Sequence, residues 1–275
     1  MTDPILEKLI RFQHPERVLP FARQLSGSTL AAIFGVDEAD YRSTLDEIDR
    51  QRIAAADRLA ADPEMRTRLL NLPFREGDRI VAIGESVTAD RLSWFELLRT
   101  LITSVRPELH LSFDNLAVSG STSTQALAAL PAIRMRSADW LFCMLGNNDS
   151  QRLSTSDASR LVSRSETVRN LAELRARALP SDSSHWVWLT PTPVDEGRLA
   201  AFPFFRAAGI TWSSADIAEL SAAIPAGHDP VIDSAPAVAA AGAHAFIEDG
   251  VHPSITTHEA LAARVVVNLT EDPPR

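Results

Sequence analysis

The pattern of hydrophobic positions divides the chain near residue 73. Before this point no strand pattern occurs, and residues 37–70 carry apolar side chains at roughly the helical period with charged residues between them. The members of this stripe are Tyr41, Leu45, Ile48, Ile53, Ala54, Leu59 and Leu69. Ser26-Gly27-Ser28 and Pro63 predict breaks between helices. We therefore expect a helical extension over residues 1–73, with its stripe buried on the rest of the chain or on a partner subunit.

From residue 74 onward, short apolar runs alternate with longer helical patterns. Strands are predicted at residues 79–84, 109–118, 139–145 and 186–189. Helices are predicted at residues 91–104, 124–133, 158–179, 197–208, 214–224 and 257–269. Strands that are apolar throughout and alternate with helices are typical of a parallel sheet covered on both faces. The sequence thus predicts an α/β domain over residues 74–275.

Composition narrows the classes of function. The 275 residues include 27 basic and 36 acidic side chains, a formal net charge of −9. Such a chain repels polyphosphate, so we expect neither nucleic acid nor an anionic membrane surface as its main partner. No run of 18 uncharged apolar residues occurs, and the N-terminal residues lack the apolar core of a signal peptide. We therefore expect a cytoplasmic protein without a membrane span.

The single cysteine, Cys143, lies in the apolar run 140–145. One thiol cannot form an internal disulfide, and no Cys/His cluster has the spacing of a zinc site. We expect Cys143 to be a small buried core residue. The sequence predicts no metal and no cofactor.

Polar or glycine-rich segments follow the predicted strands. They are residues 84–88 (GESVT), 115–122 (NLAVSGST) and 146–149 (GNND), and a further segment, residues 249–253 (DGVHP), lies near the C-terminus. In parallel sheets the ligand site lies at the carboxyl ends of the strands. We therefore expect these four segments to meet at one edge of the sheet and to form the functional site.

The residue types in these segments suit acyl transfer. Serine is a poor nucleophile at neutral pH and needs a base within hydrogen-bond reach, which His252 can supply to Ser86. Asp249, three residues before His252, can hold the other ring nitrogen and fix the tautomer. The backbone N–H groups of Ser86 and Gly120 and the Asn148 amide can stabilise a developing oxyanion. Gly120 suits that role because a residue without Cβ lets its N–H approach the substrate closely.

Together the four segments resemble those of the SGNH/GDSL hydrolases, a family of esterases and lipases. Ser86, Gly120, Asn148 and His252 match the four residues that give the family its name, and Asp249 matches its aspartate. The resemblance spans roughly residues 77–269. It implies a three-layer α/β/α fold of flavodoxin-like type and a metal-independent serine mechanism on a small-molecule ester.

Two features depart from the family pattern. Glu85 stands where the family usually has aspartate, which puts the fine geometry of the nucleophile turn in question. The helical residues 1–73 lie outside the usual core. A cap over the site and a dimerisation element, giving a homo-oligomer through the N-terminal helices, both fit them.

Other polar residues near the four segments have simpler interpretations. Asp149 is expected to orient the asparagine turn, and Thr88 and Asp90 to cap the following helix. Residues 190–195 leave the fourth strand at the same edge and are candidates for the pocket lining, with Phe202, Phe204 and Phe205 as either lining or core. Surface or satisfied core positions are expected for His14, His110, His185, His228, His244 and His258.

The resemblance therefore implies a carboxylic ester hydrolase that forms an acyl-enzyme on Ser86. Short acyl esters, O-acetyl sugars and lysophospholipid-like esters all remain open as substrates, and no substrate-binding residue is assigned. An acyltransferase with the same triad and a non-catalytic binding protein on this fold are alternatives. A flavodoxin-like nucleotide or flavin binder is less favoured, because Glu85 puts a carboxylate where a phosphate would lie.

Overall fold

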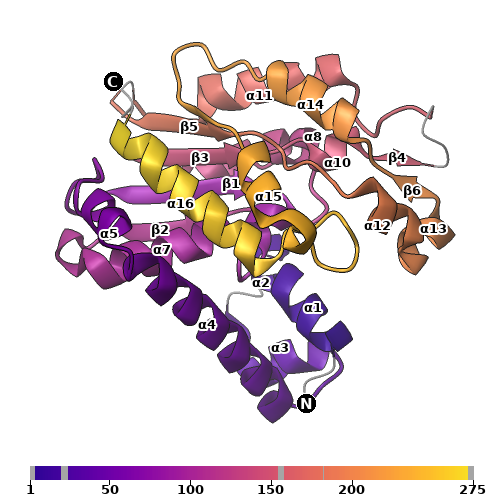
Figure 1. Ribbon diagram of the computed structural model, residues 1–275, viewed down its shortest axis with the longest axis horizontal. Coiled ribbons are helices and arrows are strands. Elements are labelled where there is room, and N and C mark those ends of the chain that lie inside the picture. The colour runs from indigo at the N-terminus through magenta and orange to yellow at the C-terminus, as the bar shows by residue number, and fades with distance from the viewer. Residues whose placement is uncertain (1–3, 20–23, 154–157, 182, 272–275) are drawn as a thin grey trace.

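The computed structural model of the protein describes residues 4–19, 24–153, 158–181 and 183–271. At its centre lies a five-stranded parallel sheet (Figure 1). In spatial order the strands are β2 (Ser112–Asn115), β1 (Arg79–Gly84), β3 (Trp140–Met144), β5 (His185–Leu189) and β7 (Val231–Ile232). This is the strand order of flavodoxin-like folds, in which a crevice opens at the carboxyl ends of β1 and β3. The predicted α/β fold class is confirmed.

The predicted strands of the central sheet differ from the observed ones mainly in two places, and a short two-stranded sheet outside it was not predicted. The second strand is shorter than residues 109–118, because a 3-10 turn over Pro107–Leu109 and His110 at a left-handed φ of 47° precede β2. Beyond β2 the chain continues beside β1 as irregular backbone, with Leu116 N–H donating to Ala82 O at 2.8 Å. β7 was not predicted, because two residues are too few to give a periodic signal.

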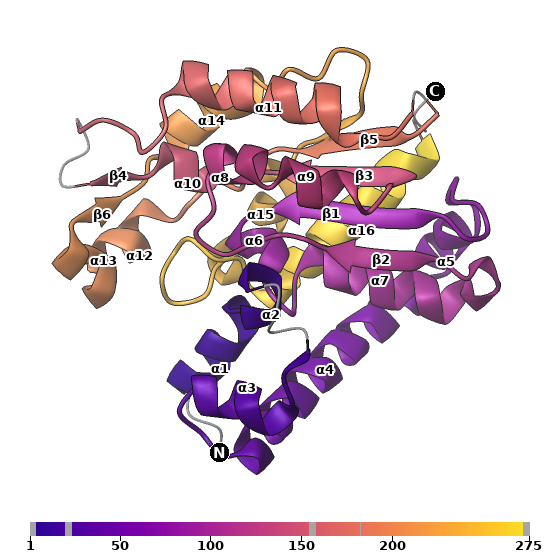
Figure 2. The ribbon, with the colours of Figure 1, turned by 180° about the vertical axis from the view of Figure 1, so that it is seen from behind.

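Helices cover both faces of the sheet (Figures 1 and 2). One layer contains α7 (Trp94–Val105), α15 (Ala235–Ala241) and α16 (Ile255–Glu271), and the other contains α8 (Ser123–Ala128), α9 (Leu130–Arg134) and α11 (Arg164–Ala178). Ile80 and Phe142 lie in the core under α7 and α16. Val81 and Cys143 lie in the core under α9 and α11, so the expected burial of Cys143 is confirmed.

In its described part, the N-terminal extension consists of helices joined by short loops. Its helices are α1 (Pro4–Phe12), α2 (Pro15–Val18), α3 (Gly27–Ile33), α4 (Glu38–Ala60) and α5 (Pro63–Leu70). Both predicted breaks are confirmed, since the Ser26 side chain caps α3 and Pro63 begins α5. Residues 1–3 and 20–23 of the predicted extension, and residues 154–157, 182 and 272–275 of the predicted α/β domain, lie outside the described residues.

The apolar stripe of α4 is buried by the chain itself. Tyr41 and Ile48 belong to a core cluster with Ile10 of α1 and Leu92. The prediction was wrong for Ile53, which is 49% exposed, and for Ala54. The buried positions of α4 are Tyr41, Thr44, Ile48, Ala55 and Ala56. Their spacing keeps to one face of the helix, and residues 53 and 54 lie off that face.

The remaining elements are short or lie near the sheet edge. They are α6 (Ser86–Ala89), α10 (Asn147–Ser150), α12 (Glu196–Ala201), α13 (Pro203–Ala208), α14 (Ser214–Ala222) and an antiparallel pair, β4 (Arg152–Leu153) and β6 (Ile210–Thr211). The predicted helix 158–179 begins only at Arg164, where the Ser163 side chain caps it. Helices 124–133 and 197–208 are each divided, the latter because Pro203 starts a new helix.

Within the described ranges, no helix is both long enough and apolar enough to cross a bilayer. The same residues contain no group of three or more His, Cys, Asp or Glu side chains arranged to hold a metal ion.

Candidate active site

Ser86, His252 and Asp249 form a hydrogen-bonded chain. Ser86 is the first residue of α6, directly after β1, while Asp249 and His252 lie in the loop before α16. Ser86 Oγ lies 2.9 Å from His252 Nε2, and His252 Nδ1 lies 2.7 Å from Asp249 Oδ2. Because the Asp249 carboxylate can only accept a hydrogen bond, His252 Nδ1 carries the proton. His252 Nε2 is then free to accept the proton of the serine hydroxyl. Such an arrangement can activate a serine hydroxyl, with the imidazole as base and the carboxylate holding the imidazole in place.

Asp249 is fully buried, and both of its carboxylate oxygens accept hydrogen bonds. Oδ1 accepts hydrogen bonds from the backbone N–H groups of Val251 and His252, both at 2.9 Å. Oδ2 accepts from His252 Nδ1 and, at 2.8 Å, from Lys8 Nζ. Burial acts to raise the pKa of Asp249, but the contacts with His252 and Lys8 outweigh it and hold that pKa well below its usual value. Asp249 is therefore ionised throughout the physiological range.

Glu85 joins the nucleophile turn to the asparagine turn. Its Oε1 accepts from the N–H groups of Gly146 (3.0 Å) and Asn147 (2.7 Å), and its Oε2 accepts from the Asn148 N–H at 2.8 Å. Burial, with the nearby Asp149 carboxylate, raises the pKa of Glu85 to about 8 against the opposing effect of these three donors. The longer side chain that departs from the family pattern thus ties the turn after β1 to the turn after β3.

Packing at the end of β1 requires glycine at position 84. A Cβ on Gly84 would lie 2.8 Å from both Met144 O and the Thr88 hydroxyl oxygen. Such contacts are too short for a carbon atom, so only glycine lets β1 run this close to β3 just before Ser86.

Gly120 and Asn148 line the same cavity as Ser86 and His252. Gly120 has a φ of 82°, while an added Cβ there would meet no atom within 4 Å. Glycine is therefore required by the backbone conformation and not by crowding. The Asn148 side-chain amide donates to Ser121 O at 2.9 Å, which fixes its orientation and leaves its second N–H for a ligand.

Asp149 connects the turn that carries Asn148 to the start of α8, which follows the Gly120 loop. Its carboxylate accepts hydrogen bonds from the Ser123 N–H (2.9 Å), the Ser123 hydroxyl and the Thr167 hydroxyl (2.9 Å). It is buried and does not line the cavity. These contacts support the expectation that Asp149 orients the asparagine turn, which stays a prediction.

The first helix of the N-terminal extension, α1, reaches the site. Lys8 Nζ lies 2.8 Å from Asp249 Oδ2, 3.0 Å from Glu248 Oε1 and 4.7 Å from the centre of the Phe202 ring. The ring of Phe12, also on α1, lies 4.4 Å from that of His252. The Phe12 carbonyl accepts from the Ser119 hydroxyl at 2.5 Å. α1 is therefore part of the site, and no local pattern near residues 8 or 12 could have shown it.

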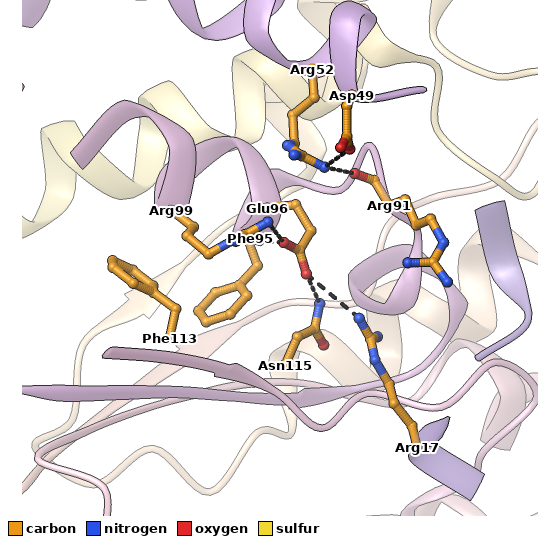
Figure 3. A pocket seen from close by; sticks show the side chains of 9 residues that line it. All are labelled: Arg17, Asp49, Arg52, Arg91, Phe95, Glu96, Arg99, Phe113 and Asn115. Atoms are coloured by element: carbon orange, nitrogen blue, oxygen red, sulfur yellow. Dashed lines mark hydrogen bonds and ion pairs between the residues drawn. The ribbon is translucent and has the colours of Figure 1, made fainter. Parts of the chain in front are cut away.

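Four arginines, Arg17, Arg52, Arg91 and Arg99, line a second cavity together with Asp49 and Glu96 (Figure 3). It has a volume of about 420 Å³. Arg17 Nη1 donates to Ala89 O (3.2 Å) and Ala117 O (3.3 Å), the carbonyls that end α6 and precede the Gly120 loop. Despite Glu96, burial and the neighbouring Arg91 lower the pKa of Arg17 to about 10.

The other arginines of this cavity also have acidic partners. Arg99 pairs with Glu96 at 2.8 Å, Arg52 with Asp49 at 2.8 Å, and Arg91 with Glu16 at 3.5 Å. Arg17 and Arg99 share Glu96, so among the described residues the four arginines have three carboxylate partners in all. The Arg17 contacts join the extension to the rest of the chain.

The cavity above Ser86 has a volume of about 810 Å³. Phe202, Phe204 and Phe205 line it, and Phe205 also belongs to a buried cluster with Trp212, so both interpretations of these aromatics hold. Residues 190–195 do not line it. Instead Thr192 exchanges hydrogen bonds with the Asn147 side chain, at 2.7 and 3.2 Å, and supports the turn from below.

The expected capping roles of Thr88 and Asp90 are wrong. Ser93 caps α7, whereas Thr88 lies inside α6 and accepts from the Trp94 indole N–H at 3.2 Å. Asp90 is fully buried between Arg11 (2.5 Å) and His258 (3.6 Å).

The remaining histidines are surface or core residues, as expected. Of the predicted set, His14 and His258 are buried, His185 is half-buried, and His110, His228 and His244 are exposed. His14 Nε2 donates to Ala89 O at 2.6 Å, and His258 Nδ1 accepts from Trp94 N–H at 3.3 Å.

No protein-family model and no curated protein sequence matches the chain. Among solved structures, the chain is similar to the acetylxylan esterase Axe2 from Geobacillus stearothermophilus, with 18% identity and a TM-score of 0.52 over 74% of this chain and 98% of the esterase. It is similar to LAE5, an α/β hydrolase from the metagenome of Lake Arreo, with 19% identity and a TM-score of 0.51 over 74% and 98%. A protein described as a GDSL-like lipase, from Parabacteroides merdae, matches with 14% identity and a TM-score of 0.52 over 73% and 98%.

These similarities and the strand order define the class of fold. The protein has the three-layer α/β/α fold of the SGNH/GDSL hydrolases, as the four sequence segments predicted. At this level of identity the comparison establishes the fold, and the function has to be argued from the site.

Proposed function

We propose that the protein is a serine hydrolase that cleaves carboxylic esters of small molecules through an acyl-enzyme on Ser86. The observation that carries the proposal is the chain from Ser86 Oγ to His252 (2.9 Å) and from His252 to Asp249 (2.7 Å) beside a cavity. Axe2 supports it, because three variants of that esterase that replace a serine, an aspartate and a histidine are described as catalytic mutants.

In the proposed reaction His252 Nε2 takes the hydroxyl proton as Ser86 Oγ attacks the carbonyl carbon of the ester. The carbonyl oxygen becomes an oxyanion, which the N–H groups of Ser86 and Gly120 and the Asn148 amide stabilise. The tetrahedral intermediate collapses, His252 returns the proton to the leaving alkoxide, and the acyl group stays on Ser86. Asp249 remains ionised and holds the imidazole in place.

The second half-reaction uses the same groups. His252 removes a proton from a water molecule, whose oxygen attacks the acyl carbon. The bond to Ser86 Oγ breaks, His252 returns the proton to that oxygen, and the carboxylic acid leaves. An alcohol in place of water would give acyl transfer, and product analysis with added alcohols distinguishes the two.

The test compares wild type with Ser86→Ala on p-nitrophenyl acetate and butyrate. We expect turnover to fall by about 10⁶-fold or below detection, as for loss of a serine nucleophile. A p-nitrophenyl phosphonate should add one label per chain to wild type and none to Ser86→Ala, read by intact mass. Ser165→Ala, an exposed serine on α11, is the matched control and should keep both activities. Full turnover in Ser86→Ala would refute the assignment, and an unlabelled, inactive wild type would favour a non-catalytic binding protein.

A further inference from the structure

The cavity above Ser86 has apolar walls that come from two distant parts of the chain. One wall is α1, and the other is the segment that runs from α13 to β6 and Trp212. Six apolar residues of these walls, named the apolar groove hereafter, are Leu9, Phe12, Phe204, Phe205, Ile210 and Trp212. Figure 1 shows α1 and the pair α12–α13 on either side of the loop that precedes α16.

The groove is apolar where solvent reaches it. Phe204 is 65% exposed and Leu9 is 44% exposed, although both line a cavity that opens next to the nucleophile. Exposed apolar side chains gathered around a concave site mark a place where an apolar ligand group displaces water. The neighbouring Phe205 and Trp212 are buried in a cluster of their own, which holds this wall in place.

The charges that face the cavity compensate one another. Lys8 is the only lysine or arginine among the described residues that line it, and its ammonium contacts the carboxylates of Glu248 (3.0 Å) and Asp249 (2.8 Å). No cation of this lining is therefore left to pair with a phosphate or a carboxylate of a ligand. An anionic substrate would instead meet two carboxylates.

Polar groups suited to a sugar are few along the walls. Away from the Ser86, Gly120 and Asn148 group, the uncharged polar side chains of the lining are Ser119, Gln13 and Gln151. The Ser119 hydroxyl already donates to Phe12 O. Carbohydrate hydroxyls placed against the aromatic wall would lose hydrogen bonds to water without replacement, which is unfavourable.

We infer that the apolar groove binds the linear apolar chain of an uncharged ester, with the reacting carbonyl at Ser86 and the chain running between α1 and α13. The inference rests on the proposed function and names its substrate class. It makes α1 a specificity element, because Leu9 and Phe12 of α1 supply one wall of the groove. Each methylene that enters the groove should raise kcat/KM by about 4-fold, from the usual gain on burying a CH₂.

The experiment uses two series of esters on the full chain. In the acyl series, p-nitrophenyl acetate, butyrate, hexanoate and octanoate share one alcohol. In the alcohol series, the acetates of ethanol, butanol, hexanol and octanol share one acyl group. A rise of kcat/KM with chain length in either series supports the groove, and the series that rises shows which side of the ester it holds.

Variants connect the rise to the groove. In Leu9→Ala and Phe204→Ala the ratio of kcat/KM for the longest ester to that for the shortest should fall by about 10-fold. Ile53→Ala and Met135→Ala also shorten exposed apolar side chains, 49% and 84% exposed, but lie outside the cavity and should keep the wild-type ratio. Thermal unfolding of all four variants checks that the fold is retained.

The outcomes separate this inference from the proposed function. If the short esters are cleaved and both series are flat, the groove does not bind the chain, while the hydrolase stands. If no ester is cleaved and Ser86 takes no phosphonate, the hydrolase fails, and the groove is then tested by calorimetry of n-octanol with the Ser86→Ala protein. Binding that Phe204→Ala weakens supports the groove in that case, and absence of binding overturns it.

Discussion

Replacing Lys8 by methionine tests whether the N-terminal helix tunes the candidate base. Lys8 Nζ and His252 Nδ1 contact the same atom, Asp249 Oδ2, at 2.8 and 2.7 Å. Methionine keeps most of the apolar stem that lies against Phe202 and removes the charge. The chain has no other lysine, so the substitution is also the loss of its only primary amine side chain.

The size of the effect follows from the distances. Two atoms at 2.8 and 2.7 Å from a shared oxygen lie within about 5.5 Å of each other. Two unit charges at that separation repel by about 3 kcal/mol at an effective dielectric constant of 20, and by about 0.8 kcal/mol in water. The Lys8 side chain is 29% exposed, so the value lies between these limits. Since about 1.4 kcal/mol corresponds to one pH unit, removing the charge should move the acidic limb of the pH–activity profile upward by roughly 1 pH unit.

The assay is kcat/KM for p-nitrophenyl butyrate from about pH 5 to about pH 9, whose acidic limb reports protonation of the free enzyme's base. We expect the midpoint of that limb to move upward in Lys8→Met and to stay in place in Lys8→Arg, which keeps the charge. Identical midpoints in all three proteins would refute the electrostatic reasoning. A uniform loss of activity at every pH would assign Lys8 a packing role on Phe202 instead.

Three further substitutions test the supports of the site. Burial lowers the pKa of His258 in the folded protein, against the opposing effect of Asp90. Stability that is present above the unfolded-state pKa of about 6.5 is therefore lost as the pH falls through the folded-state pKa. His258→Gln should flatten the fall of the urea midpoint between about pH 7 and about pH 5, and the exposed control His228→Gln should not. Above about pH 8, where Glu85 is ionised and accepts from three backbone N–H groups, Glu85→Gln turns an amide N–H toward these donors and should cost about 1–3 kcal/mol of unfolding free energy in urea. Asp149→Asn should lower kcat by up to about 100-fold through displacement of the Asn148 turn, with one phosphonate label still added slowly. Unchanged kcat in Asp149→Asn would contradict that positioning role.

The core of the fold could be predicted because its signals are local. β1, β3 and β5 are buried on both faces, so each is a dense apolar run that stands out against the helices around it. The four polar segments follow from the same pattern, since a parallel sheet brings strand ends together. Ile53 shows the limit of a short periodic signal, because one residue of shift on a helix moves a side chain by about 100°.

Contacts across long stretches of sequence could not be predicted. Lys8 and Asp249 are 241 positions apart, and nothing near either residue indicates the other. The role of Glu85 was equally hidden, because its partners are the backbone N–H groups of residues 146–148, which every sequence possesses. Comparison with the family pattern identified Glu85 as a departure. Only the structure, in which the turns after β1 and β3 lie together, shows that the longer side chain reaches the N–H groups of residues 146–148.

The extension contacts the loops around Ser86, so the same residues hold both the apolar groove and the candidate catalytic residues in place. Arg11 pairs with the buried Asp90 at 2.5 Å, and His14 and Arg17 both donate to Ala89 O. Ala55, Leu69 and Phe74 lie in one hydrophobic cluster with residues of the sheet, whereas Ile10, Tyr41 and Ile48 belong to another, so the extension packs both on the sheet domain and on itself. We infer that α1 can shape the groove because the cluster of Ile10 with Ile48 and Leu92, together with the buried Arg11–Asp90 ion pair, fixes it next to α6. A substitution that loosens that junction should disturb chain selectivity and the Ser86 turn together.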